Sequence, residues 1–173
     1  MTNILKQIIF GTALATALFN PFTQVGNTEE LNKNFQSSMY IEERVITADL
    51  IKRIIEVESQ GNPRAYNQRS RARGLMQIIP IALKEYNLHN PTERHSLNDL
   101  FNPEINKKVG KWGLYRIKNY YLSVYKLPPT VENILAAYNM GPPSLNKIGD
   151  AKKNFTRLPR QTRTYITKIT QKK

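Results

Sequence analysis

The sequence of 173 residues contains no cysteine. This absence excludes disulfides, thiolate metal sites, a cysteine nucleophile and a lipid anchor on cysteine, although it does not settle the redox compartment. Acidic residues are also scarce, with 13 Asp and Glu against 26 Lys and Arg, so the net charge is +13. Such a chain is attracted to anionic material, which includes nucleic acid, membrane surfaces and acidic cell-wall polymers.

The basic residues are spread along the chain instead of being gathered in one tract. Local groups occur at residues 69–73, 107–111 and 152–163. Scattered lysines and arginines are typical of a solvated basic surface. We therefore expect no specific nucleic-acid site.

Several common catalytic motifs are missing as well. The sequence has no Gly-x-Ser-x-Gly elbow, no glycine-rich phosphate loop and no His-Glu-x-x-His helix. His89 and His95 are the only histidines, and both lie in a polar stretch that we predict to be a loop. A solvated or structural role suits them better than metal binding, so we expect neither a metal nor another cofactor.

The first residues have the features of a signal peptide. Lys6 provides a positive start, residues 8–19 are apolar, and Ala15-Thr16-Ala17 is a small-x-small cleavage site. The apolar stretch is short for a membrane span, but an uncleaved anchor stays open as an alternative. We predict a signal peptide over residues 1–19, followed by a linker or loosely packed lead-in over residues 20–45.

The rest of the chain predicts helices, because strand-like alternation is almost absent. Thr47 is an N-cap for a helix that ends before Gln60-Gly61-Asn62-Pro63. A polar loop follows, and Pro80 occupies the first position of a second, short helix. The length of the chain suits one globular domain.

Three further helices complete the predicted domain. Asn102-Pro103-Glu104 begins a long helix that continues to Leu127-Pro128-Pro129. Thr130 caps the next helix, Gly141-Pro142 ends it, and a last helix covers about residues 159–169. The long helix should direct the following side chains inward: Ile105, Val109, Trp112, Ile117, Tyr121 and Val124. We predict a mainly α fold.

Glu58 is the residue that most strongly indicates chemistry. It follows Ile54 and Ile55 at helical spacing, on the apolar face, whereas Glu56 lies about 200 degrees around the helix and should face solvent. A carboxyl against an apolar wall has a raised pKa and can act as a general acid near neutral pH. The alternative is a carboxylate held by a structural hydrogen bond or ion pair.

Six short motifs then occur in a characteristic order and spacing. They are Glu58-Ser59, Asn62-Pro63-x-Ala65, Gly74-Leu75-Met76-Gln77, Asn102-Pro103-Glu104-x-Asn106, Ala136-Ala137-Tyr138-Asn139-x-Gly141-Pro142 and Thr162-Arg163-x-Tyr165. Residues 46–170 therefore resemble the catalytic domain of the soluble lytic transglycosylases, a lysozyme-like fold related to goose-type lysozymes. The resemblance implies little or no β structure.

The resemblance also implies an activity, namely cleavage of the β-1,4 bond between N-acetylmuramic acid and N-acetylglucosamine in peptidoglycan. Glu58 would be the single catalytic acid and base, and Gln77, Tyr138 and Asn139 would line the sugar groove beside it. A lone carboxylate suffices where the acetamide of the substrate attacks the anomeric carbon. The C6 hydroxyl would then close a 1,6-anhydro ring. Ser59 is a further candidate for substrate contact, although it could instead hydrogen-bond within its own helix end.

The sequence departs from the family pattern at several positions. The segment from Glu58 to Gly74 is one residue longer than is common, and Arg71 stands where a glycine is usual. Ile79 replaces a frequent methionine. Gln161 replaces a glutamate that could contact the peptide stem or adjust the pKa of Glu58, and we keep Gln161 as a candidate substrate contact.

Two alternatives to a transglycosylase stay open at this point. A hydrolytic muramidase on the same fold would need a second carboxylate, for which Asp99 and Glu104 are candidates. A non-catalytic peptidoglycan-binding assembly module would need no acid on an apolar face. We expect an exported protein, periplasmic or at the cell surface, that acts as a monomer. By analogy it could open the wall locally for a secretion, conjugation or phage apparatus.

Overall fold

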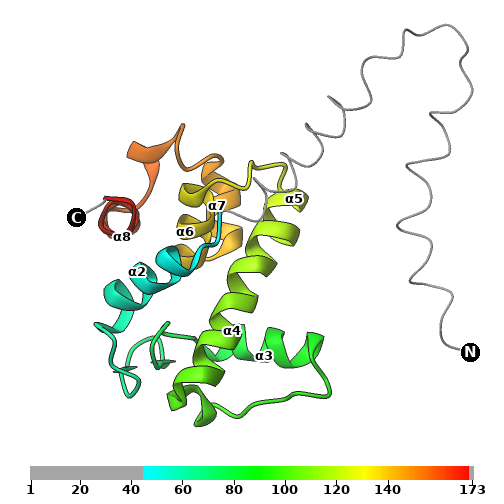
Figure 1. The fold of residues 1–173 in the computed structure, drawn as a ribbon. Coiled ribbons are helices and arrows are strands. Elements are labelled where there is room, and N and C mark those ends of the chain that lie inside the picture. The colour runs from blue at the N-terminus through cyan, green and yellow to red at the C-terminus, as the bar shows by residue number, and fades with distance from the viewer. Residues whose placement is uncertain (1–44, 172–173) are drawn as a thin grey trace, which may run out of the picture. The chain divides into compact units, whose positions relative to one another are not determined.

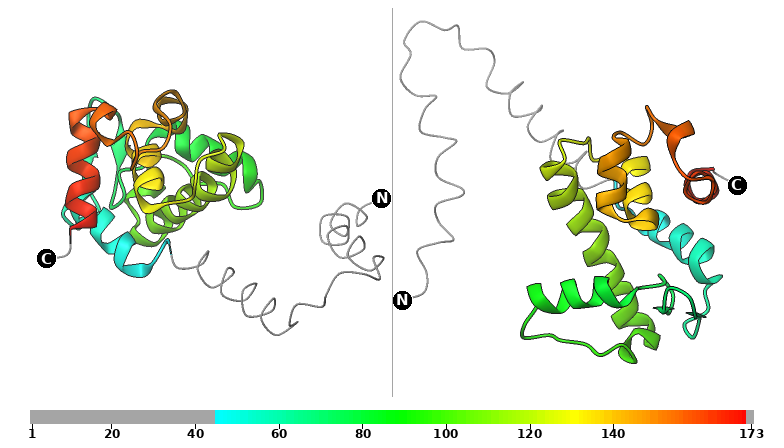
Figure 2. Two further views of the ribbon diagram at one scale, coloured as in Figure 1. Left: turned by 90° about the horizontal axis from the view of Figure 1, so that it is seen from above. Right: turned by 180° about the vertical axis from the view of Figure 1, so that it is seen from behind.

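The computed structural model describes residues 45–171, which Figures 1 and 2 show as a set of helices with one small hairpin. The predicted mainly α fold is confirmed. The predicted signal peptide and residues 20–44 of the predicted lead-in lie outside the described residues. Within residues 45–171, no helix combines the length and the apolar character that crossing a membrane requires.

Helix α2 (Ala48–Ser59) carries the predicted acid. The Thr47 side chain caps it by accepting a hydrogen bond of 3.0 Å from the backbone N–H of Leu50. The helix ends where Gln60 adopts a left-handed conformation. Its inner face is buried, whereas Glu56 is exposed as the helical spacing predicts.

A short antiparallel hairpin follows α2. Its strands are β1 (Tyr66–Asn67) and β2 (Ala72–Arg73), which pair Tyr66 with Arg73. This hairpin was not predicted, because strands of two residues are too short to show alternation in the sequence. Arg71, in the turn, has a φ of +59°. This left-handed conformation costs a residue other than glycine about 1 kcal/mol, which agrees with the glycine usual at this position in the family.

Helix α3 (Pro80–His89) begins with proline at its first position, as predicted. The assignment of His89 to a loop was wrong, since His89 is the last residue of this helix and its Nδ1 lies 2.9 Å from the carbonyl oxygen of Glu85. The helix continues this far because the first residue that opposes it is Pro91, which disfavours helical geometry at the residue before it. His95 does lie in the loop that follows.

Helix α4 (Pro103–Arg116) follows a 3₁₀ turn at Asp99–Phe101. The Asn102 side chain caps it by accepting hydrogen bonds from the backbone N–H groups of Glu104, at 2.9 Å, and Ile105, at 3.3 Å. The predicted combination of an N-cap asparagine and a proline at the first helical position is confirmed.

The predicted long helix is interrupted after α4. A π-helical turn (Ile117–Tyr121) leads into α5 (Leu122–Val124). Val124 is 57% exposed, so its predicted inward position was wrong. A π turn takes more residues per turn than an α-helix, which rotates the later side chains and directs Leu122 into the core instead. The other residues predicted to point inward are buried or pack against the core.

Helix α6 (Val131–Met140) lies at the centre of the fold in Figure 1. The Thr130 hydroxyl oxygen caps it by accepting a hydrogen bond from the backbone N–H of Asn133 at 3.2 Å. Gly141, with a φ of +87°, ends it as predicted. The next helix, α7 (Pro142–Ile148), was not predicted, because the same proline that marks a stop also suits a first helical position.

The last helix, α8 (Arg160–Thr170), follows a 3₁₀ turn at Phe155–Arg157 and matches its predicted position closely. It packs against both α2 and α6. Arg53 of α2 donates a hydrogen bond of 2.6 Å to the carbonyl oxygen of Ile169, which joins α2 to the end of α8.

The core lies between these helices. Fully buried side chains from five helices and from the loop after β2 contribute to it, namely Ile54, Met76, Leu114, Leu135, Leu145 and Ile169. Leu75, Met76 and Ile78 are buried as predicted, and Trp112 packs against the core from its edge.

Asn106 of α4 organises the polar centre of this core. It is fully buried, its Oδ1 accepts a hydrogen bond from the backbone N–H of Met76, and its Nδ2 donates to the carbonyl oxygens of Arg73 and Leu100, all at 2.8 Å. A Cβ on Gly74 would lie 2.2 Å from Asn106 Nδ2 and 2.2 Å from the Leu100 oxygen. Only glycine fits at this position. The hydrogen bond from Met76 to Asn106 holds the segment after Gly74 against α4.

Candidate active site

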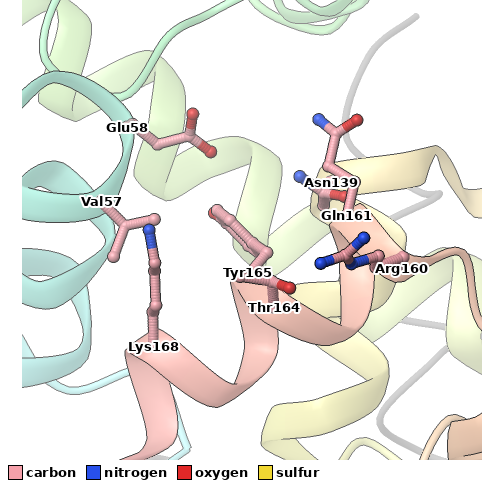
Figure 3. A pocket seen from close by; sticks show the side chains of 8 residues that line it. All are labelled: Val57, Glu58, Asn139, Arg160, Gln161, Thr164, Tyr165 and Lys168. Carbon is pink, nitrogen blue, oxygen red and sulfur yellow. The ribbon is translucent and has the colours of Figure 1, made fainter.

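An open pocket of about 440 Å³ lies where α2, α6 and α8 meet, and Figure 3 shows its side chains. The helices meet there because α8 packs against both of the others. The lining residues are Val57 and Glu58 of α2, Asn139 of α6, and Arg160, Gln161, Thr164, Tyr165 and Lys168 of α8. Glu58, Asn139 and Gln161 are thus brought together from three separate parts of the chain.

Glu58 has the electrostatic properties of a general acid. Burial raises its pKa from the ordinary value of 4.5 to about 7, because the folded protein withholds water from the ionised carboxylate. The side chain is nevertheless only half-buried and lines the pocket, so a ligand can reach it. It is the only acidic residue among those that line this pocket.

Two tyrosines surround this carboxyl group. The Tyr165 hydroxyl opposes the effect of burial and lowers the pKa of Glu58, although it forms no hydrogen bond of normal geometry with any described residue. This contact is therefore weaker than a full hydrogen bond. The Tyr138 hydroxyl donates a hydrogen bond of 2.8 Å to the carbonyl oxygen of Met76. Burial, and then the charge of Glu58, raise the pKa of both tyrosines well above its usual value, so both hydroxyls stay protonated.

Asn139 of α6 and Gln161 of α8 both line the pocket. Asn139 lies near the end of α6, and its Oδ1 accepts a hydrogen bond of 2.9 Å from the buried Thr162 hydroxyl. This bond leaves the amide nitrogen of Asn139 as the group that can donate to a ligand. Gln161 is exposed in the first turn of α8.

The other predicted site residues do not line this pocket. Gln77 has a positive φ of 49°, and its Nε2 donates to the carbonyl oxygens of Ala65, at 3.2 Å, and Gly74, at 3.0 Å. It therefore supports the loop between the hairpin and α3. The Ser59 hydroxyl donates to the carbonyl oxygen of Ile55 at 3.2 Å, which is the local bond within the helix end that its position allowed.

The two candidates for a second carboxylate also lie away from the pocket lining. The Asp99 carboxylate accepts a hydrogen bond of 2.6 Å from the backbone N–H of Ser96, and Glu104 is exposed and paired with Lys107 at 2.7 Å. Over residues 45–171, no group of three or more His, Asp or Glu side chains is placed to hold a metal ion.

Most of the α8 residues in the pocket were not predicted to belong to the site. Arg160, Thr164 and Lys168 follow one another at intervals of four residues, so they share one face of the helix. That polar row was visible in the sequence, beside the buried row that includes Ile166 and Ile169. The sequence could not show that the row faces a carboxyl group on a helix more than 100 residues earlier.

Comparisons with known proteins show the family and the fold to which this chain is similar. The family model of the transglycosylase SLT domain matches residues 36–159. The membrane-bound lytic murein transglycosylase E of Buchnera aphidicola subsp. Acyrthosiphon pisum is 35% identical over 100 residues, which are 57% of this chain and 45% of that protein. The chain thus spans less than half of that relative.

A solved structure shows the same fold. The 70 kDa soluble lytic transglycosylase of Escherichia coli matches with a TM-score of 0.58 and 24% identity, over 82% of this chain and 22% of that chain. The predicted lysozyme-like character of the domain is therefore confirmed at the level of the fold. Since the family model also covers more than half of the sequence, the chain belongs to the transglycosylase SLT domain family.

Proposed function

We propose that this protein is a peptidoglycan lytic transglycosylase that cleaves the β-1,4 bond between N-acetylmuramic acid and N-acetylglucosamine. The observation that carries the proposal is Glu58, a carboxyl group with a pKa of about 7 that lines an open pocket without a second acid. Membership of the SLT family and relatives named as lytic transglycosylases support the same reaction.

The proposed chemistry uses Glu58 twice. In the first step, protonated Glu58 gives its proton to the leaving glycosidic oxygen while the acetamide oxygen of the muramic acid residue attacks its anomeric carbon. In the second step, the Glu58 carboxylate takes the proton of the C6 hydroxyl, and that oxygen displaces the acetamide to form the 1,6-anhydro ring. Glu58 ends protonated, as it began, so a pKa near neutrality suits both steps.

The neighbouring groups would hold the substrate in place. We propose that the Asn139 amide nitrogen and the Gln161 side chain donate to the sugars or their substituents, since both lie at the pocket beside Glu58. Tyr138 does not line the pocket, and we propose that it shapes the groove through its hydroxyl, which holds the backbone at Met76. Gln77 would act by shaping the loop, and Ser59 by ending α2, close to the acid.

The two rival functions are less well supported. A hydrolytic muramidase needs a base for water, and neither Asp99 nor Glu104 lines the pocket of Glu58. A non-catalytic binding module would gain nothing from an acid with a raised pKa, because an ionised carboxylate binds polar groups at least as well.

The biological setting is part of the same proposal. Peptidoglycan lies outside the cytoplasm, so we propose that the protein is exported and that its positive charge attracts it to the anionic wall. Local opening of the wall for a secretion, conjugation or phage apparatus would suit a small enzyme. A fusion of residues 1–30 to a reporter that is active only outside the cytoplasm tests export, and an inactive reporter would contradict it.

The mass of the products distinguishes a lytic transglycosylase from a hydrolytic muramidase. Purified peptidoglycan is incubated with the protein, and the released muropeptides are measured by mass spectrometry. We expect products that are lighter by one water than the hydrolysis products, because no water enters the bond. Products of hydrolytic mass would indicate a muramidase, and the absence of products would indicate a binding module.

A further inference from the structure

Three large apolar side chains are exposed along the end of α4 and the segment that follows it. These are Tyr115, Tyr120 and Val124, which are 37%, 45% and 57% exposed, and which we call the apolar stripe. None of them lines the pocket of Glu58. Figures 1 and 2 show α6 between α8 and this part of the molecule. The proposed reaction therefore gives the apolar stripe no role.

The π turn brings these three side chains into line. In an α-helix, residues four positions apart lie on the same face, so an uninterrupted helix would follow Tyr115 with an asparagine and then a serine. The π turn instead contains a backbone hydrogen bond between residues five apart, from the N–H of Leu122 to the carbonyl oxygen of Ile117. The extra residue places Tyr120 and then Val124 on the face of Tyr115. The turn thus replaces a polar face by an apolar one.

Tyr120, at the centre of the apolar stripe, is held by its neighbours. The Arg116 guanidinium lies 3.7 Å from the centroid of the Tyr120 ring. Arg116 is itself fixed, because its Nε donates a hydrogen bond of 3.0 Å to Glu85, which also accepts one of 2.8 Å from the Tyr121 hydroxyl. An aromatic ring that is ordered before binding loses little conformational entropy when a partner covers it. Tyrosine and arginine are also enriched at the energetic centres of protein interfaces.

The charge around the apolar stripe indicates the kind of partner. From residue 105 to residue 131 the sequence has six lysines and arginines and no aspartate or glutamate. Lys111 and Lys126 are exposed and form no ion pair with any residue that the structure describes. Lys111 lies four residues before Tyr115, so it shares the face of the stripe. A complementary partner offers apolar side chains with acidic ones beside them.

The shape of the apolar stripe suits a helix. A line of side chains along one helix packs against a second helix, with the ridges of one in the grooves of the other. The face from Lys111 to Val124 is about 20 Å long at about 1.5 Å per residue, which matches a partner helix of about 14 residues. We propose that the apolar stripe binds an acidic amphipathic helix of a second protein. This interaction is independent of the proposed reaction.

Two other occupants fit the apolar stripe less well. A second copy of this chain also has a net charge of +13, so two copies repel each other. A lipid surface suits a broad apolar face, whereas this stripe is one side chain wide and two of its three members carry hydroxyl groups. The second protein is therefore the occupant to test first.

The test uses the full chain and a synthetic helical peptide of about 14 residues, with leucines on one face and glutamates beside them. One control peptide has glutamine in place of every glutamate, and the other has serine in place of every leucine. The stripe variant is Y115S/V124S. The control variant, I81S/L88S, removes two exposed apolar side chains of α3. Thermal melting verifies that both variants fold.

We expect the acidic peptide to bind the parent in a fluorescence anisotropy titration, and Y115S/V124S to weaken binding by about tenfold or more. The control variant should bind like the parent, and both control peptides should bind more weakly than the acidic peptide. K111Q should weaken binding by about threefold, and K84Q, at an exposed lysine of α3, should not. No binding to the parent, equal losses in both double variants, or equal affinity for the acidic and glutamine peptides would overturn the inference.

Two measurements identify the other occupants if one of them is correct. Flotation with vesicles of phosphatidylglycerol and phosphatidylcholine measures lipid binding, and sedimentation velocity measures self-association. We expect Y115S/V124S to behave like the parent in both. A loss of vesicle binding or of a dimer in this variant, with peptide affinity unchanged, would overturn the inference in favour of that occupant.

The release of muropeptides separates this inference from the proposed function. Y115S/V124S should release them at the parental rate, because neither residue lines the pocket. Peptide binding by a protein that releases no muropeptides would contradict the proposed function and leave the docking surface intact. Normal release without peptide binding would contradict the docking surface alone.

Discussion

Two polar side chains, Asn106 and Glu58, lie against the same core. They differ in how completely their hydrogen-bonding groups have partners. Asn106 is fully buried, and its amide forms three hydrogen bonds of 2.8 Å to backbone groups of other segments. Glu58 is half-buried, and only the weak contact with Tyr165 favours its ionised form.

The difference separates a structural group from a reactive one. A buried polar group whose hydrogen bonds are complete stabilises the segments that it joins, and its loss leaves their backbone groups without partners. A desolvated carboxyl without such partners keeps its proton to higher pH and can give it to a substrate. Asn106 therefore holds the fold together, whereas Glu58 is available for chemistry.

The largest expected effect concerns activity at Glu58. The substitution Glu58→Gln keeps the size of the side chain and removes the proton that must reach the leaving oxygen. We expect the rate of muropeptide release to fall by about a hundred to ten thousand fold, as for other positioned general acids. The melting temperature should not fall, because a neutral amide replaces a carboxyl that burial disfavours.

The matched control for this experiment is Glu56→Gln on the exposed side of the same helix. It should keep a rate close to that of the parent. A Glu58→Gln variant that releases anhydro-muropeptides at the parental rate would remove Glu58 from the mechanism. A variant that is inactive because it is unfolded would make Glu58 a structural residue like Asn106.

The next effect concerns stability at Asn106. Asn106→Ala leaves the Met76 N–H without a partner and opens a small cavity, so we expect a loss of about 3 kcal/mol in the free energy of unfolding. Asn146→Ala, on the exposed face of α7, should change it by less than about 0.5 kcal/mol. Urea unfolding measures both. A loss at Asn106 as small as that at Asn146 would show that its hydrogen bonds are not structural.

A smaller effect links the charge of Glu58 to stability. The folded protein holds this proton up to a pKa of about 7, whereas an unfolded chain releases it near 4.5. The folded state thus binds more protons within this window, so the parent loses stability as pH rises from about 4.5 to 7. As pH rises across this range, the melting temperature of Glu58→Gln should increase relative to that of the parent. The melting temperature of Glu56→Gln should show no such trend. A constant difference between Glu58→Gln and the parent would mean that Glu58 is not desolvated.

The smallest effect concerns Tyr165. Tyr165→Phe removes the hydroxyl that lowers the pKa of Glu58, so the pKa should rise and the alkaline limit of activity should move to higher pH. The fold should tolerate the change, since this hydroxyl forms no full hydrogen bond with the described residues. A pH–rate profile measures the shift. Movement of the alkaline limit to lower pH would contradict the assigned direction.

Local signals allowed much of the fold to be predicted from the sequence. The caps at Thr47, Asn102 and Thr130 each lie where a side-chain oxygen accepts the first free backbone N–H groups of a helix. The different exposure of Glu56 and the half-buried Glu58 also follows from helical spacing alone. These features depend on residues within one or two turns of each other.

The features that the sequence did not predict depend on distant contacts or on small changes in geometry. The π turn before Val124 has no clear local signal, yet it changes which side chains face the core. The pocket depends on the packing of α8 against α2 and α6, so the proximity of Lys168 to Glu58 could not be derived from spacing. Tyr165 belonged to a recognised motif, but its effect on Glu58 required the tertiary structure.

The most direct test of the catalytic role of Glu58 is a measurement of its pKa. The side-chain carboxyl carbons are observed by NMR as pH is varied, and the signal that is missing in Glu58→Gln assigns Glu58. We expect a titration midpoint near 7, with the carboxyl largely protonated at pH 6. A midpoint near the ordinary value of 4.5 would contradict it, because Glu58 would then be ionised at neutral pH and could not serve as the general acid.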